Sequence, residues 1–352
     1  MKTPSVKSGS GRSTPAAMPK RGRAATLPAI PGPHLVEMYR MMVRLRKFEE
    51  RCYQIYLQRK IGGFCHIYSG QEAVAVGMLS LLGPQDYVIT AYRDHGQAIA
   101  RGMSMKACMA ELYGKATGCS RGKGGSMHFF DTSIHFMGGH GIVGAHIPPA
   151  CGIGWAIKHQ KKNGVCICFF GDGAMNQGAV HEGLNLAGLY KLPVIFVCEN
   201  NGYAMGTAVS RGSAEENIYL RANAYKMPTF RVDGNNLFEV YETTAAAIQK
   251  ARTEFQPSFI EAVTYRYRGH SMSDPGTYRT REEVEAHKAR DPIGLVAQHL
   301  IKTKTSPQEQ LDQIAAEESL AVEDAVKFAE ESPQPDAASA AEDVYVSDPS
   351  HA

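Results

Sequence analysis

Two short polar turns near the middle of the chain carry oxygen atoms that suit a cation. The first is Gly171-Asp172-Gly173 and the second is Asn200-Asn201, and the 26 residues 174–199 separate them. Mg²⁺ prefers hard oxygen ligands, usually one or two from the protein together with phosphate and water. Asp172 offers a carboxylate and Asn201 an amide oxygen, while glycine lets the backbone approach a phosphate closely. These residue types favour a diphosphate–magnesium site, although a lone Gly-Asp-Gly is more often only a tight turn.

The segments around the two turns predict a βαβ unit. Residues 165–170 are a short apolar run, residues 176–190 have apolar positions at helical spacing, and residues 194–198 are apolar and largely β-branched. Because such a crossover joins parallel strands, both turns should emerge at strand carboxyl ends, on the edge where open α/β sheets bind ligands. Alternating strands and helices elsewhere predict an α/β fold with a doubly wound parallel sheet flanked by helices.

Further elements are expected on both sides of this unit. Helices are predicted from residue 34 to Gly62-Gly63 and over 71–81, 106–113, 151–160 and 237–252, and strands over 87–91, 230–232 and 259–267. The glycine-rich segment 119–144 shows little periodicity and should be a long functional loop, and 270–281 is expected to be another. Ser306-Pro307-Gln308-Glu309 is typical of a capping box with proline at the first helical position.

Charge divides the chain of 352 residues into three expected parts. Residues 1–36 contain six Lys or Arg and no acidic residue, whereas twelve acidic residues accompany only Lys327 from residue 306 to the end. We therefore expect a disordered basic tail over 1–33, an α/β domain that binds the cofactor and metal over 34–305, and an acidic helix and tail over 306–352.

Composition also argues against several classes of function. The net charge of +3 gives no reason to expect nucleic acid, and no apolar run approaches the roughly 20 residues of a membrane helix. The eight cysteines form no Cys-x-x-Cys pair, so we interpret them as buried thiols of a reducing compartment.

Several longer motifs connect the chain with a known family. Besides the paired turns, the sequence contains GGFCHIYSGQEAVAVG, ITAYRDHG, RGKGGSMHFF, GGHGIVGA, TYRYRGHSMSDPG and YRTREE, in that order. From about residue 38 to about residue 292 the chain resembles the α subunits of the decarboxylating first component of pyruvate dehydrogenase complexes, in the two-chain form. The resemblance implies thiamine diphosphate and Mg²⁺ as cofactors. It also implies decarboxylation of pyruvate, with transfer of the acetyl group to a lipoyl group.

The resemblance assigns roles to individual residues. It makes Asp172, Asn201 and the backbone carbonyl of Tyr203 the metal ligands. His66 and His270 are the catalytic candidates, in contact with substrate, acyl intermediate or phosphate, because histidine handles protons and anions near neutral pH. The expected cofactor-binding set is Tyr92, Arg93, Gly141, Val143, Asp172, Gly173, Ala174, Asn201, Met205 and His270.

Some of these residues also have a structural explanation, and a further residue, Ser271, is a candidate for regulation. Arg93 could instead form a surface salt bridge, the histidines could be structural, and Met205 could serve only in packing. Ser271 matches a serine that is phosphorylated in mitochondrial relatives, and added negative charge there should inhibit.

A second chain is expected to complete the site. In the two-chain family the glutamate that activates the cofactor comes from the β subunit, so this chain should be inactive alone and work in an α₂β₂ heterotetramer. The substrate would be pyruvate, and the lipoyl domain of the dihydrolipoamide acetyltransferase would be a further partner. Acetoin or branched-chain 2-oxo acid dehydrogenase α subunits are alternatives of the same fold, and a non-catalytic scaffold subunit is the alternative from another class. The expected location is a bacterial cytoplasm, with the mitochondrial matrix as the alternative.

Overall fold

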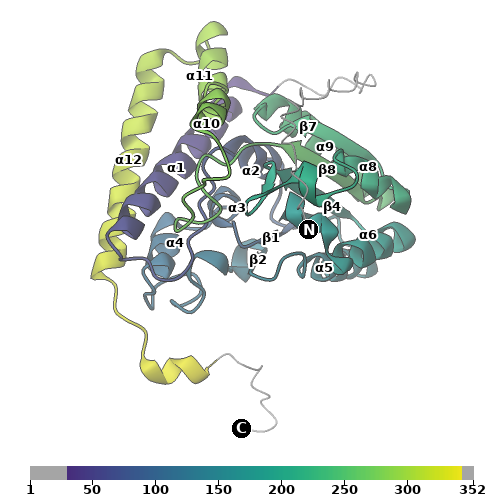
Figure 1. Cartoon of the computed structure of the whole chain (residues 1–352), viewed down its shortest axis with the longest axis horizontal. Coiled ribbons are helices and arrows are strands. Elements are labelled where there is room, and N and C mark those ends of the chain that lie inside the picture. Colours follow the sequence, from purple (N-terminus) through teal and green to yellow (C-terminus); the bar gives the residue numbers. More distant parts are fainter. Residues whose placement is uncertain (1–29, 343–352) are drawn as a thin grey trace, which may run out of the picture.

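The computed structural model describes residues 30–342 and contains a central sheet of six parallel strands (Figure 1). Residues 1–29 of the basic tail expected over 1–33, and residues 343–352 of the acidic segment expected over 306–352, lie outside the described residues. The strand order is β2-β1-β3-β4-β8-β7, with non-consecutive neighbours joined by helical crossovers. This arrangement confirms the predicted doubly wound α/β fold. The bounds are β1 (Tyr87–Ala91), β2 (Phe136–His140), β3 (Cys166–Gly171), β4 (Val194–Asn200), β7 (Thr229–Asp233) and β8 (Ser258–Val263).

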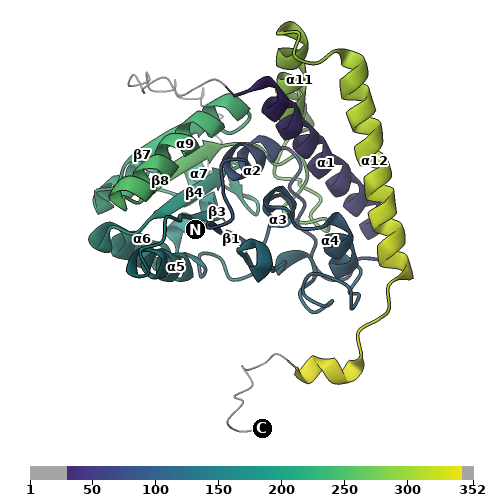
Figure 2. The ribbon, with the colours of Figure 1, turned by 180° about the vertical axis from the view of Figure 1, so that it is seen from behind.

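Helices cover both faces of the sheet because the central strands are apolar on both sides. In β3, Ile167 and Phe169 belong to one buried cluster, and Cys168 and Phe170 belong to the other. The first cluster is closed by α1 (Gly32–Leu57), α2 (Glu72–Leu79), α3 (His95–Arg101), α4 (Met105–Leu112) and α9 (Leu237–Glu254). The second is closed by α5 (Ile147–His159), α6 (Gly178–Tyr190) and α8 (Ile218–Arg221). Figure 2 shows α5 and α6 at the opposite end of the molecule from α1.

The C-terminal helix α12 (Gln308–Glu331) packs along α1 and α4, as both views show (Figures 1 and 2). Its residues Leu311, Ile314, Val322 and Val326 are buried in the first cluster, and Phe328 packs against it partly buried. The predicted capping box is wrong. Pro307 itself is the N-cap, without a side-chain cap bond, and the Ser306 hydroxyl donates to Gln310 Oε1 at 2.8 Å. Because Ser306 lies one residue before the cap position, it bonds a side chain instead of the free backbone N–H groups.

The segment expected as one long loop, 119–144, contains the edge strand β2, so that expectation is wrong in part. A Cβ at Gly139 would collide with the Asp94 carboxylate, and one at Gly138 would lie 2.6 Å from the Phe130 ring. Close packing therefore demands glycine in this strand, and glycine removes the apolar alternation by which a strand is recognised.

Other boundaries also differ from the sequence expectation. Helix α1 ends at Leu57 and not at the glycine pair, since Arg59 already adopts a left-handed φ of 59°. Helix α5 begins four residues before Cys151, with prolines in its first turn, and the last predicted strand stops at Val263. Helix α3 was not predicted, nor were α10 (Arg281–Lys288) and α11 (Pro292–Lys302).

The remaining elements are short. They are the hairpin β5 (Tyr203–Ala204) and β6 (Thr207–Ala208), the turn α7 (Val209–Gly212), and 3₁₀ turns at Gly125–Met127, Thr132–Ile134, Asp172–Asn176, Ala222–Tyr225 and Ala337–Ala341. All eight cysteines are free thiols, and seven are buried. Among the described helices, none is long and apolar enough to cross a membrane.

Candidate cofactor and metal site

A cavity of about 710 Å³ lies at the carboxyl ends of β1, β3 and β4. The end of β1 and the segment after it contribute residues 91–93, and the end of β3 and the turn after it contribute 171–174. Strand β4 and its following turn contribute Glu199 and Asn201. Every site residue expected from the sequence lines this one cavity: His66, Tyr92, Arg93, Gly141, Val143, Asp172, Gly173, Ala174, Asn201, Tyr203, Met205, His270 and Ser271.

Asp172 and Asn201 are brought together by the pairing of two neighbouring strands. Gly171 of β3 lies opposite Glu199 of β4, so the residues that follow both strands emerge side by side. Asp172 is 4% exposed, and burial raises the pKa of its carboxyl to about 6. A carboxylate that is disfavoured by burial is one that a bound cation would stabilise. A Cβ at Gly173 would approach the Ala204 Cβ to 2.7 Å, so the turn requires glycine there.

A positive group already faces the other two expected metal ligands. Arg266, 2% exposed, donates from Nη1 to Asn201 Oδ1 at 3.2 Å and to the Tyr203 carbonyl at 3.3 Å. Its Nη2 donates to the Met205 carbonyl and the Tyr278 hydroxyl, at 3.1 and 2.8 Å. The oxygens of Asn201 and Tyr203 are therefore turned toward a cation, and together with the Asp172 carboxylate they fit a hard metal ion.

The two adjacent asparagines have different surroundings. Asn200 donates to Glu261 Oε1 at 2.7 Å and accepts from the Gly202 N–H, which fixes the end of β4. Asn201 lines the cavity and donates from Nδ2 to Gln71 Oε1 at 3.0 Å. The paired asparagines thus combine a structural residue with one that lines the cavity and whose Oδ1 accepts from Arg266.

His66 and His270 lie together with Tyr92 on another wall. The histidine ring centroids are 5.1 Å apart, and His66 lies 4.6 Å from the Tyr92 ring. Arg93 donates from Nη1 to the Ile67 carbonyl and from Nη2 to the His270 carbonyl, both at 2.8 Å. Arg93 therefore ties the two histidine-bearing segments together and does not form the surface salt bridge that was the plainer alternative.

Both histidines are held neutral by their surroundings. Burial, with a further contribution from Arg93, lowers the pKa of His66 to about 2 and that of His270 to about 4. The Nδ1 atoms of both are buried without a hydrogen-bond partner among the described residues. Burial also lowers the pKa of Arg93, to about 10, so it remains charged at neutral pH. This wall consists of a cation and two imidazoles with unused nitrogens, a combination that suits an anionic ligand.

The loop with Ser271 is folded against the cavity by Asp274. The Asp274 carboxylate accepts from the backbone N–H of His270 at 2.6 Å, from that of Gly276 at 2.8 Å, and from the Tyr278 hydroxyl at 2.9 Å. Burial alone would raise the pKa of Asp274, but these hydrogen bonds keep it below its usual value. Ser271 is 5% exposed, and its hydroxyl lies 2.9 Å from that of Ser273.

Sequence reasoning missed three buried polar residues that line the cavity: Gln71, Glu199 and Arg266. Glu199 accepts from the Tyr68 hydroxyl and from Gln97 Nε2, and burial raises its pKa to about 7. The sequence did contain a hint for each of these three residues, because each lies within a few positions of a residue that was assigned to the site. Their buried contacts, however, depend on segments far apart in the sequence.

The mouth of the cavity is apolar and exposed. Phe64, Val143 and Met205 line it with exposed fractions of 62%, 39% and 65%, and Ile142 beside Val143 is 74% exposed. We call these four residues the apolar lip. Met205 adopts a left-handed φ of 54°, an unusual conformation for a methionine that often marks a functional position.

The fold and the cavity define a class of α/β protein whose ligand site lies at the carboxyl ends of parallel strands. The family described as "Dehydrogenase E1 component" matches residues 39–338, and the chain belongs to this family. Membership implies dependence on thiamine diphosphate.

Three similar proteins, two from bacteria and one from a eukaryote, carry the name pyruvate dehydrogenase E1 component subunit alpha. That of Rickettsia felis is 44% identical over 310 residues, covering 88% of this chain and 95% of its own length. That of Zymomonas mobilis is 46% identical over 317 residues, covering 88% and 89%. The somatic mitochondrial form of Homo sapiens is 44% identical over 316 residues, covering 89% and 80%.

Proposed function

We propose that this chain is the α subunit of a pyruvate dehydrogenase. Together with a β subunit it decarboxylates pyruvate and passes the acetyl group to the lipoyl group of a dihydrolipoamide acetyltransferase. The names of its relatives support the substrate and reaction. The observation that carries the proposal is that every residue assigned through the family resemblance lines a single cavity, although these residues come from segments 200 positions apart, between His66 and His270.

The proposed metal is Mg²⁺, held by Asp172, Asn201 and the carbonyl of Tyr203. Three protein oxygens leave room in an octahedron for diphosphate oxygens and water. The orientation of Asn201 and Tyr203 toward Arg266, and the glycine required beside Ala204, support this assignment.

Other residues would hold the diphosphate. Arg93 remains charged at neutral pH and lines the cavity beside Tyr92, and an arginine fork suits phosphate oxygens. Gly141, Val143, Gly173 and Ala174 also line the cavity, and their backbone is proposed to contact the same group.

Thiamine diphosphate, when bound, supplies the carbanion that attacks a 2-oxo acid and holds the electrons left by the loss of CO₂. His66 and His270 are proposed to contact the substrate carboxylate or the acyl group, because their neutral rings line the cavity. A neutral imidazole can donate a hydrogen bond to an anion at one nitrogen and hold a proton in transfer. Met205 is proposed to press against the cofactor from the lip.

The β subunit is proposed to cover the apolar lip and to supply the glutamate that activates the cofactor, within an α₂β₂ heterotetramer. The exposure of four large apolar residues around a cofactor-sized cavity supports this assignment. The lipoyl domain would then reach the cavity in the assembled complex. The bacterial relatives support a bacterial cytoplasmic location, which is proposed on that ground.

Ser271 is proposed as a point of inhibition by phosphorylation. Its hydroxyl lies in the cavity wall next to His270, so a phosphate of about −1.5 to −2 charge would repel the anionic ligands. Because Ser271 is 5% exposed, a kinase would have to act on an opened loop.

Release of CO₂ by this chain co-purified with its β subunit tests the proposed substrate. Pyruvate, a branched-chain 2-oxo acid and acetoin would each be supplied with Mg²⁺, thiamine diphosphate and an artificial electron acceptor, and acetoin cleavage would be followed as acetaldehyde. We expect pyruvate to be preferred. Preference for the branched acid or for acetoin would show that this compound, and not pyruvate, is the substrate. No turnover of any of the three would favour a non-catalytic scaffold subunit.

A further inference from the structure

Gln71 is a buried glutamine with one end engaged at the proposed metal site and the other end free. It has no exposed surface and lines the cavity. Its Oε1 accepts from Asn201 Nδ2 at 3.0 Å, while its Nε2 is buried without a partner among the described residues. A buried amide with an unused donor next to a ligand-binding cavity requires an explanation.

The contact between Gln71 and Asn201 decides which end of the asparagine amide faces the cation. An asparagine side chain has an oxygen that accepts and a nitrogen that donates, and exchanging them requires only a rotation. With Nδ2 committed to Gln71, Oδ1 faces Arg266 Nη1, which also donates to the Tyr203 carbonyl. The opposite rotamer would present N–H groups to a metal ion. We propose that Gln71 is a positioning residue that fixes Asn201 for metal binding, an inference that rests on the metal site proposed above.

The backbone on both sides of Gln71 is held firmly enough for this task. Gly70 has a φ of +100°, and a Cβ there would collide with the Tyr265 carbonyl oxygen, so the turn is restricted to glycine. The Gly70 N–H donates to both carboxylate oxygens of Glu72, at 3.1 and 3.0 Å, and its carbonyl accepts from the Thr264 hydroxyl at 3.3 Å. Gln71 is therefore flanked by two residues that bind each other.

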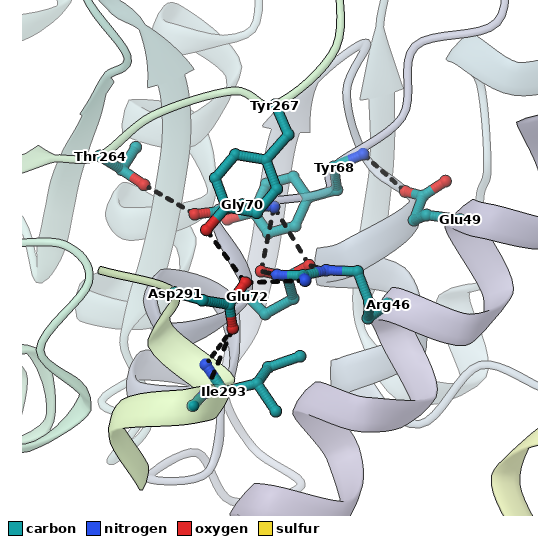
Figure 3. Close-up of polar contacts among 10 residues, drawn as sticks. Arg46, Glu49, Tyr68, Gly70, Glu72, Thr264, Tyr267, Asp291 and Ile293 are labelled. Atoms are coloured by element: carbon teal, nitrogen blue, oxygen red, sulfur yellow. Dashed lines mark hydrogen bonds and ion pairs between the residues drawn. The ribbon is translucent and has the colours of Figure 1, made fainter. Parts of the chain in front are cut away.

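Figure 3 shows how an ion cluster fixes this turn. Arg46 of α1 donates to Glu72 from Nε at 2.6 Å and from Nη2 at 3.0 Å, and from Nη1 to Asp291 at 2.8 Å. Asp291 also accepts from the Tyr267 hydroxyl at 3.0 Å and caps α11 through the Ile293 N–H. The cluster thus connects the turn that carries Gln71 with the segment that carries Arg266.

Buried ion pairs are weak evidence for stability, because desolvation offsets most of their attraction. Here the cluster has a geometrical consequence. It holds residues 70–72 and 265–267 in fixed positions relative to each other. These two segments carry the hydrogen-bond partners of both ends of the Asn201 amide.

The experiment measures Mn²⁺ affinity of the full α/β complex by electron paramagnetic resonance, with saturating thiamine diphosphate. Gln71→Leu removes both hydrogen-bonding ends at similar volume, and Gln71→Glu keeps an acceptor for Asn201 Nδ2. Gln97→Leu is the matched control, because Gln97 is equally buried but donates to Glu199 and not to Asn201. We expect Gln71→Leu to weaken Mn²⁺ binding by about tenfold, in the range for partners of metal ligands. The Mn²⁺ affinities of the Gln71→Glu and Gln97→Leu complexes should stay within about threefold of that of the wild type.

Four results would overturn the inference. Wild-type Mn²⁺ affinity in Gln71→Leu would show that Asn201 needs no orienting partner. An equal loss in Gln97→Leu, or no recovery in Gln71→Glu, would mean that any disturbance of this buried layer has the same effect. If the wild-type complex itself binds no Mn²⁺ with thiamine diphosphate, the proposed metal site fails and the role of Gln71 fails with it.

Discussion

The two ends of the cavity differ in almost every physical property. The deep end consists of buried polar side chains with defined hydrogen bonds, such as Asp172, Asn201 and Arg266, which are 4%, 7% and 2% exposed. The apolar lip consists of large hydrophobic side chains that no part of the described chain covers, with Ile142 74% exposed. Both ends belong to one cavity, but only the deep end is complete.

This difference indicates which part of the site the chain builds alone. Buried polar groups need fixed partners, and the deep end finds them within the chain. Exposed apolar residues gathered at a mouth gain free energy when another surface covers them. On the proposed function, this chain would provide the metal and diphosphate half of the site, and the proposed β subunit would cover the lip.

Asp172→Ala should produce the largest effect, because it removes an anionic ligand from the deep end. We expect Mn²⁺ affinity of the complex, with thiamine diphosphate, to fall by more than about 100-fold, beyond the range for partners of metal ligands. Electron paramagnetic resonance measures this. Asp312→Ala, at an exposed position on α12, is the control. A similar affinity in both variants would refute the assignment of the deep end.

Ser271→Asp should reduce kcat/KM for pyruvate by about 30-fold, roughly 2 kcal/mol of transition-state stabilisation. The added carboxylate would face the anionic ligands beside His270. Ser271→Ala, which adds no charge, should keep most of the activity. Steady-state decarboxylation measures both, and equal losses in the two variants would exclude the electrostatic explanation.

Ile142→Glu should weaken association with the β subunit by about tenfold, roughly 1.4 kcal/mol, because a charge would be desolvated at the lip. Sedimentation of the two chains at several concentrations measures this. Leu320→Glu on α12 is the matched control, since Leu320 is 71% exposed but lies outside the lip. Unchanged association of the Ile142→Glu variant with the β subunit would show that the lip is not part of the subunit interface.

His66→Gln should produce the smallest effect, on stability in acid. The folded-state pKa of about 2 lies below the unfolded value near 6.5, so stability is complete above pH 6.5 and is lost as the pH falls below it. Between pH 7 and 5.5 the wild-type complex should lose about 1 kcal/mol more unfolding free energy than His66→Gln. Denaturation midpoints at both pH values test this, with His159→Gln, exposed on α5, as the control. An equal acid loss in wild type and His66→Gln would show that His66 is not held neutral.

The sequence was most informative where local pattern and function coincide. Residues 165–201 have strong apolar runs bounded by glycine and asparagine, so the βαβ unit and the position of Asp172 and Asn201 could be predicted. The edge strand β2 could not, because close packing against Asp94 and Phe130 demands glycine where a strand pattern would need apolar residues. Helix α11 had a usable signal in Asp291-Pro292, a cap followed by proline.

The candidate site shows the same division. Residues within the motifs could be assigned to the cavity one by one, but their partners could not. Arg266 and Gln71 contact Asn201 across 65 and 130 positions of sequence, and only the folded chain brings them together. Long-range hydrogen bonds of this kind leave no periodicity in the sequence.

The central claim is that this chain is half of a pyruvate-decarboxylating site. The most direct test is CO₂ release from pyruvate by the chain alone, by its β subunit alone and by the assembled complex, each with Mg²⁺ and thiamine diphosphate. We expect turnover only from the complex. Turnover by the isolated chain, or a correctly assembled complex without turnover, would contradict the account.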